Sequence, residues 1–272
     1  LYFQSAAGHI GLTAGATAAT LTHTGSLYAN AGNNTGTVTI GSGVTVQGSG
    51  ALTNSDSNGG WVNNGTILNN STGTLNISPA NFTNNGTIRT TAGTLKFFLS
   101  WINDGLIEIG AGSTVSMDSN AYNANGAYNG ANLINNGVIR GSGTLDLGYT
   151  SVWASTQYLY TLMTLTNNGT LDPGVGAGGT GTLTVKGNLV QGTGGTIHLD
   201  LGGTDAGQYD KLSVVGMTQQ SPTAQLGGTL EIVEGSNGFY ADLGDIFPNL
   251  VTTSGVLSGS FSNVSTPADV VF

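Results

Sequence analysis

Asn63-Asn64-Gly65-Thr66-Ile67 is the first of five copies of one phrase, and the repetition of this phrase decides the fold. Successive copies start 21, 19, 32 and 32 residues apart, at Asn84, Asn103, Asn135 and Asn167. A second phrase, Gly-Thr-Leu, follows most copies and begins at Gly73, Gly93, Gly143 and Gly181. A period of about 20 residues is typical of a solenoid, in which one short structural unit is stacked many times.

Each phrase has a structural interpretation. Asn-Gly tolerates the positive φ that a sharp corner requires, while Thr-Ile and Thr-Leu-x-Ile alternate polar and apolar residues as a half-buried strand does. One copy is therefore predicted to be a corner, a short strand, a second corner at glycine and a second strand. Such a unit buries its apolar face only when copies are stacked. The predicted corner residues are Asn64, Gly65, Asn85, Gly86, Asn136, Gly137, Asn168 and Gly169.

Two other folds compete with the solenoid. Asn-Gly also favours β-hairpins, so a sandwich of hairpins is the alternative, although hairpins do not require the same flanking phrase at each repeat. Glycine interrupts nearly every possible helix, except in residues 149–168, where 155–165 could form a short helix. We expect an all-β solenoid of roughly 10–12 coils, about 50 Å long, with asparagines at equivalent corners hydrogen-bonded into ladders.

The composition excludes several classes of function. The 272 residues include 46 Gly, no Cys, and 5 Lys and Arg against 14 Asp and Glu, which gives a net charge of −9. So few cations do not match a phosphate backbone or an anionic lipid surface, which excludes nucleic-acid binding and charge-driven membrane binding. The lack of cysteine excludes disulfides, thiolate metal sites and cysteine nucleophiles. No run of about 20 apolar residues predicts a membrane-spanning helix.

The two phrases resemble those in the β-helical passengers of bacterial autotransporters and related large surface adhesins. The C-terminal third adds to the resemblance through Gly-Thr-Leu-Thr-Val at 181–185, Gly-Thr-Ile-His-Leu-Asp-Leu at 195–201, Tyr-Asp-Lys-Leu-Ser-Val at 209–214 and Gly-Ser-Phe-Ser-Asn-Val at 259–264. This succession is similar to the passenger segment that precedes the membrane-anchoring barrel, and the resemblance covers about residues 30–272. It implies a right-handed parallel β-helix, type V secretion to the outer cell surface, and a barrel outside this sequence. It specifies function weakly, because this solenoid carries adhesins, proteases, esterases and stalks alike.

The sequence divides the chain into three segments. Residues 1–8 are expected to be the remnant of a cleavage tag, at 1–5, and a disordered start. Residues 9–186 are expected to form solenoid repeats with insertions at 118–131 and 149–163. Residues 187–272 are expected to form C-terminal coils that end before any membrane anchor.

Residues suited to acid–base chemistry are scarce. His198 lies in the run Thr-Ile-His-Leu-Asp, where a period of two turns it away from the core together with Thr196 and Asp200. This pattern favours a solvated strand residue over a catalytic base. Asp200, Asp205 and Asp210 are five residues apart, and a solvated loop is favoured over an acid cluster or a weak calcium site. The sequence therefore predicts no catalytic constellation, no metal site and no cofactor.

The two 32-residue repeats hold the best pointer to function. Their insertions start 15 residues after Asn103 and 14 residues after Asn135, so coils in register place them side by side. Tyr and Trp among Asn, Ser and Gly suit recognition surfaces and sugar stacking, whereas packing of the rings into a small satellite core is the alternative. The candidate binding residues are Tyr122, Tyr128, Trp153, Tyr158 and Tyr160.

These observations favour a non-catalytic adhesin at the outer bacterial surface. Its expected partners are host or bacterial surface glycans or proteins, or another copy of itself, as in biofilm formation, aggregation and virulence. An ice-binding solenoid competes with this interpretation, on the strength of Thr-x-Thr steps at 20–24, 37–39 and 182–184 that do not recur on every coil. An inert stalk for another domain and a polysaccharide-processing β-helix enzyme are two further candidates.

Overall fold

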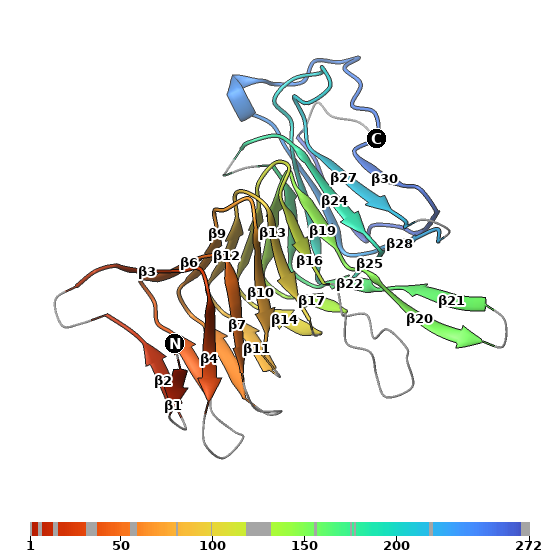
Figure 1. Ribbon diagram of the computed structural model, residues 1–272. Helices are drawn as coiled ribbons and strands as arrows, with labels where there is room; N and C mark the ends of the chain where they lie inside the picture. The colour runs from red at the N-terminus through yellow and green to blue at the C-terminus, as the bar shows by residue number, and fades with distance from the viewer. Residues whose placement is uncertain are drawn as a thin grey trace.

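The chain folds into a stack of parallel coils, with its two ends toward opposite ends of the stack (Figure 1). The computed structural model describes the chain apart from residues 1, 5–6, 13–15, 31–36, 55–58, 80, 99, 118–131, 155–156, 175, 177, 218–219 and 268–272. Within the described residues, three parallel sheets of ten strands run along the stack, and each of ten coils gives one strand to every sheet. The predicted right-handed parallel β-helix is confirmed.

We call the three faces sheets A, B and C. Sheet A contains β1 (Tyr2–Gln4), β4 (Ser26–Asn30), β7 (Gly50–Asn54), β10 (Thr74–Ser78), β13 (Thr94–Phe97), β16 (Thr114–Ser116), β19 (Thr144–Asp146), β24 (Thr182–Lys186), β27 (Lys211–Val215) and β30 (Val251–Thr253). Sheet B contains β2 (Ala7–Ile10), β5 (Thr37–Ile40), β8 (Gly60–Asn63), β11 (Asn81–Asn84), β14 (Trp101–Asn103), β17 (Leu133–Asn135), β22 (Thr164–Asn167), β25 (Asn188–Gln191), β28 (Thr223–Leu226) and β31 (Val256–Gly259). Sheet C contains β3 (Ala19–His23), β6 (Val44–Gly48), β9 (Thr66–Asn69), β12 (Thr87–Thr90), β15 (Leu106–Ile109), β18 (Val138–Gly141), β23 (Thr170–Pro173), β26 (Thr196–Asp200), β29 (Thr229–Val233) and β32 (Asn263–Ser265).

Three sequence expectations are corrected. Each coil has three strands rather than the predicted two. The additional strand belongs to sheet B and ends at the first Asn of the phrase, as β8 ends at Asn63. Residues 2–4 and 7–8, expected within the tag remnant and disordered start, lie in strands β1 and β2, which pair with β4 and β5. The short helix that 155–165 could form is not observed, because the described residues of this segment, apart from Met163, belong to two strands. They form part of β21 (Gln157–Leu162), which pairs in antiparallel fashion with β20 (Tyr149–Ala154), and the start of β22. Among the described residues, no helix is long and apolar enough to span a bilayer.

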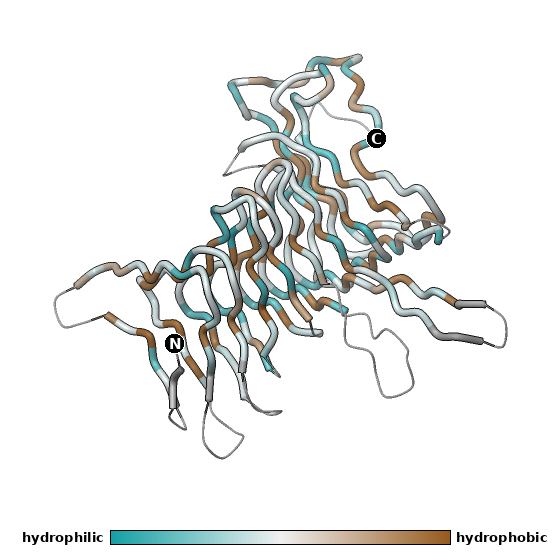
Figure 2. The backbone as a smooth tube through the Cα atoms, viewed as in Figure 1, coloured by the Kyte–Doolittle hydropathy of each residue, from teal (hydrophilic) through white to brown (hydrophobic). Residues whose placement is uncertain are grey.

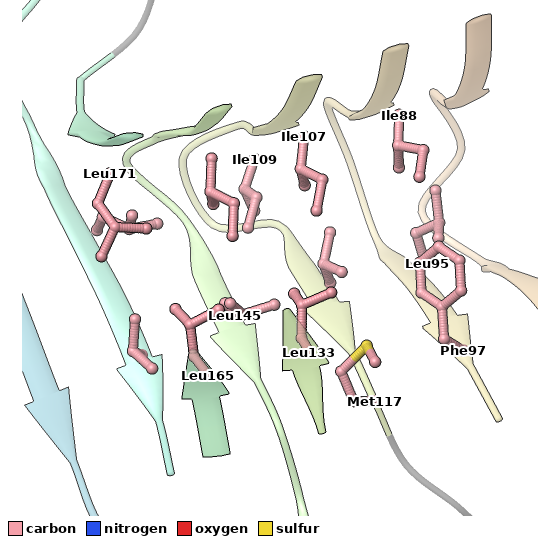
Figure 3. Close-up of a cluster of buried hydrophobic side chains, with 14 of the residues drawn as sticks. Ile88, Leu95, Phe97, Ile107, Ile109, Met117, Leu133, Leu145, Leu165 and Leu171 are labelled. Atoms are coloured by element: carbon pink, nitrogen blue, oxygen red, sulfur yellow. The ribbon is translucent and has the colours of Figure 1, made fainter. Parts of the chain in front are cut away.

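The core is a continuous column of aliphatic side chains inside the three sheets. Parallel register places Ile67, Ile88 and Ile107 in one inward row of sheet C, and all three are fully buried. Figure 3 shows equivalent Leu and Ile side chains of neighbouring coils meeting in the interior. In β9 and β12, buried residues alternate with more exposed ones, as the repeat predicted. Figure 2 shows hydrophobic segments recurring among more hydrophilic ones from coil to coil. Fully burying one such side chain contributes about 1.5–3 kcal/mol, so the column is the main source of stability.

A ladder of buried amides runs along the corner between sheets B and C. Its members are the first Asn of each phrase, and Gln191 continues it into the next coil. Each Asn Nδ2 donates a hydrogen bond to the side-chain oxygen of the next member, at 2.7 Å between asparagines and at 2.9 Å from Asn167 to Gln191 Oε1. In order along the stack, the members are Asn63, Asn84, Asn103, Asn135, Asn167 and Gln191. The predicted asparagine ladder is confirmed. Each buried Asn of the ladder is the residue just before a predicted corner Asn, as Asn63 is before Asn64. The predicted corner residues Asn64 and Asn85 instead form an exposed hydrogen bond, from Asn85 Nδ2 to Asn64 Oδ1 at 3.0 Å.

The corner glycines are required by close packing between coils. Positive φ was the expected reason for glycine at Gly65, Gly86, Gly137 and Gly169, yet none of the four has it. A Cβ added at Gly86 would instead lie 2.2 Å from the carbonyl oxygen of Gly65 in the coil below. The repeat therefore selects glycine because the backbones of successive corners are nearly in contact.

Candidate functional site

A β-hairpin stands outside the three sheets. Strands β20 and β21 pair only with each other, with Trp153 opposite Tyr158 and Tyr149 opposite Leu162. The hairpin leaves the stack at its side, between β19 and β22 (Figure 1). The solenoid continues beneath it without a change of register, since Leu133 of β17 pairs with Leu165 of β22. The hairpin is therefore an addition to a complete scaffold.

Both predicted insertions leave from the same corner of successive coils. One lies between β16 and β17 and the other between β19 and β22, and each therefore joins sheet A to sheet B. The residues that follow the two insertions are also joined by a hydrogen bond, in which the Thr164 N–H donates to Asn132 Oδ1 at 2.9 Å. The insertion at 118–131, with Tyr122 and Tyr128, lies outside the described residues.

The predicted aromatic residues of the hairpin are only partly placed. The side chains of Trp153 and Tyr158 lie outside the described part of the structure, although their backbones form the hairpin. Tyr160 is half-buried, and its ring packs edge to face on Tyr149 with centroids 5.2 Å apart. Tyr149 keeps 39% of its surface exposed and Leu159 keeps 52%. The hairpin thus exposes part of Tyr149 and Leu159 next to the contact between the Tyr149 and Tyr160 rings.

Sheet C carries a second feature, a row of outward charges in a chain that is only 7% charged. Each member follows the buried Ile or Leu of its strand, and the sign of the charge alternates along the stack. We define the charged row as Arg89, Glu108, Arg140, Asp172, His198 and Glu231. Both arginines of the chain belong to it.

Glu108 is the centre of the first half of the row. Its side chain is 9% exposed, and its two oxygens lie 2.7 Å from Arg89 Nε and 2.8 Å from Arg140 Nε. A buried carboxylate held by two guanidinium groups is a fully paired charge, so this half of the row is a structural ion-pair ladder.

The second half of the row forms a cluster of carboxylates around one imidazole. His198 Nδ1 lies 2.9 Å from Glu231 Oε2, and His198 Nε2 lies 3.7 Å from Asp200 Oδ1. One ligand-type atom from each of Asp172, His198 and Asp200 lies within 4.8 Å of the others. Asp200 was expected in a solvated loop, and this expectation is wrong, because Asp200 ends β26 and is 4% exposed. His198 was expected to face away from the core on a solvated strand, and it does lie on the outer face with 26% of its side chain exposed, but it is held between carboxylates there.

Burial and charge shift the pKa values in this cluster. Burial is the largest influence on Asp172 and raises its pKa to about 6, against the opposing pull of His198. Burial lowers the pKa of His198, but the hydrogen bond to Glu231 and the neighbouring carboxylates outweigh it, so the pKa is raised overall. The cluster thus resists carrying all of its negative charges without a cation.

Asp210 lies next to the cluster, in contact with the backbone of Asp200. It is fully buried and accepts backbone hydrogen bonds from Asp200 N at 2.9 Å and from Gly181 N at 2.7 Å. Burial raises its pKa to about 8, although the two donors lower it. The solvated loop expected for the three evenly spaced aspartates is therefore wrong for Asp200 and Asp210, whereas Asp205 is exposed.

Sequence reasoning missed the charged row, although a signal for it exists. Every member stands immediately after the apolar residue of its strand, so aligning the strands coil by coil brings the charges into one column. Unequal coil lengths hide this column when the chain is read linearly. Comparisons with family models, with curated proteins and with solved structures find no match to this chain.

Proposed function

We propose that this chain is a non-catalytic adhesive segment of a protein on the outer surface of a bacterial cell, and that the hairpin β20–β21 forms part of its binding surface. One observation carries the proposal. The hairpin adds six-residue strands outside a solenoid whose register does not need them. Binding residues are commonly carried on additions that a rigid scaffold positions.

The chemistry of the hairpin favours glycans, or a protein surface of similar polarity, as ligands. Its strands include Tyr149, Trp153, Tyr158 and Tyr160, and aromatic rings stack on the apolar faces of sugars while their polar edges form hydrogen bonds. The large faces of the solenoid are mostly neutral, which suits a polar partner or a second copy of the chain. Location at the cell surface rests on the resemblance to autotransporter passengers.

The proposal is tested by substituting hairpin aromatics and measuring binding to a glycan array. The variant Trp153→Ala/Tyr158→Ala should lose binding while its far-UV circular dichroism stays that of the parent. Tyr240→Ala is the matched control, because Tyr240 is 71% exposed and lies outside the hairpin. Sedimentation velocity over a range of concentrations covers self-association. Equal binding and equal self-association by all three proteins would refute a role for the hairpin.

A further inference from the structure

Asp172, His198 and Asp200 bring three ligand-type side chains to one place on sheet C. Asp172 lies on β23, and His198 and Asp200 lie on the neighbouring strand β26. The pairing of Leu171 with Ile197, both buried, puts Asp172 and His198 side by side on the outer face. The three ligand-type atoms lie within 4.8 Å of one another, and so are close enough to contact one ion after small side-chain movements.

The orientation of His198 suits a metal ligand. Its Nδ1 lies 2.9 Å from Glu231 Oε2, and a carboxylate there accepts the Nδ1 proton, which leaves Nε2 as the ligand atom. Nε2 is 3.7 Å from Asp200 Oδ1, too far for a hydrogen bond. Two ligands of a tetrahedral zinc ion, with bonds of about 2.0–2.2 Å, lie about 3.3–3.6 Å apart. The observed separation is therefore close to that of two ligands sharing an ion.

The two aspartates of the cluster are poor in hydrogen-bond donors among the described residues. The Asp200 side chain is only 5% exposed, and no described residue donates a hydrogen bond to its carboxylate. Asp172 Oδ1 is buried and has no hydrogen-bond partner among the described residues. A buried carboxylate without a donor is costly, and a bound cation removes that cost.

The surrounding charges do not supply such a cation. Arg140 is next to Asp172 in the charged row, but its guanidinium group is used by Glu108: Arg140 Nε donates a hydrogen bond to Glu108 Oε2 at 2.8 Å. Glu231 and Asp210 add two further carboxyl groups to the neighbourhood. Carboxyl groups therefore outnumber basic groups around the three residues.

We propose that Asp172, His198 and Asp200 bind a divalent transition-metal ion of the Zn²⁺ type, with Glu231 as the positioning residue of the imidazole. One imidazole and two carboxylates suit Zn²⁺, Co²⁺ or Mn²⁺ better than Ca²⁺ or Mg²⁺, which prefer sites made of oxygen alone. Because His198 keeps 26% of its side chain exposed, solvent can reach the site and supply a fourth ligand. The site replaces the sequence expectation of no metal, and it does not depend on the hairpin.

The test is calorimetric titration of ZnCl₂ into protein first dialysed against EDTA, with CaCl₂ as a comparison. We expect saturable binding of one Zn²⁺ per chain, a raised thermal midpoint, and much weaker binding of Ca²⁺. His198→Gln should weaken Zn²⁺ binding at least tenfold, and Glu231→Gln should weaken it about tenfold, as loss of an outer-shell partner does. His9→Gln is the matched control, because His9 is exposed and lies in the first coil, far from the cluster in the stack.

A second readout needs no variant. Co²⁺ added to the parent protein should produce visible absorption bands whose intensity reports a low coordination number with nitrogen and oxygen ligands, and Zn²⁺ should displace it. Circular dichroism shows whether each variant is folded. Absence of saturable Zn²⁺ binding to the parent protein, or equal binding by the parent protein and folded His198→Gln, would overturn the proposal.

Discussion

Replacing Asn135 with alanine tests the buried amide ladder. Asn135 lies in the middle of the ladder, fully buried, where it accepts from Asn103 Nδ2 at 2.7 Å and donates to Asn167 Oδ1 at 2.7 Å. Alanine removes the donor of Asn167 Oδ1. Asn103 Nδ2 still reaches the Gly105 carbonyl oxygen at 3.0 Å, so most of the loss falls on Asn167.

The expected cost follows from one stranded acceptor and a small cavity. A buried polar group without its partner costs about 1–3 kcal/mol, and the space left by the amide adds to this. We expect Asn135→Ala to lower the free energy of unfolding by about 2–4 kcal/mol. Urea unfolding followed by far-UV circular dichroism measures the shift of the midpoint.

Asn136→Ala is the matched control for this measurement. Asn136 is the next residue in the same phrase and also belongs to a row of side-chain contacts, with Asp104 Oδ1 at 2.9 Å and with Asn168 at 3.2 Å. Because Asn136 is exposed, its loss should cost no more than about 0.5 kcal/mol. Equal losses for the two variants, or a negligible loss for Asn135→Ala, would show that the buried ladder does not hold the coils together.

Three further predictions concern the packing and charge of the stack. Gly137→Ala should lower the urea midpoint strongly or prevent folding, because the new Cβ would lie 2.0 Å from the Gly105 carbonyl oxygen; an unchanged midpoint would contradict close coil packing. Glu108→Gln should cost about 1–3 kcal/mol in urea unfolding, because it removes a charged partner from two arginines, and a gain in stability would contradict the ion-pair ladder. In EDTA, thermal stability should fall as pH rises from about 4 to about 8, because folded Asp210, with its pKa raised to about 8, keeps a proton that the unfolded chain has released. Asp210→Asn should flatten that slope, and an unchanged slope would contradict the assignment.

The repeat predicted the architecture because its residues act locally. Ile67 and its equivalents occupy the same inward position of every copy, and stacking the copies buries them, so the solenoid and its ladders follow from the sequence. The third strand of each coil was missed because sheet B strands such as Trp101–Asn103 are three or four residues long and share only their final Asn across the central coils. Short strands of varied sequence give little periodic signal.

The candidate sites were harder to predict because they depend on register between coils. The corner shared by the two insertions follows from their offsets within the repeat, and the strands that flank them confirm it. The cluster around His198 could not be predicted in the same way. Asp172 and His198 are 26 residues apart, and His198 and Glu231 are 33 apart, so no single spacing connects them. Burial of Asp200 depends on the surrounding three-dimensional packing, which the alternation of residues along a strand does not encode.

The most direct test of the proposed adhesive role removes the hairpin and leaves the solenoid intact. Residues 149–162 would be replaced by a short glycine-containing turn that joins Gly148 to Met163, whose backbones are already hydrogen-bonded at 3.2 Å. The trimmed and parent proteins would then be compared on the same glycan array and by sedimentation velocity. The proposed role predicts that the trimmed protein keeps its circular dichroism and unfolding midpoint but loses ligand binding or self-association. A trimmed protein that binds and associates as the parent does would contradict it.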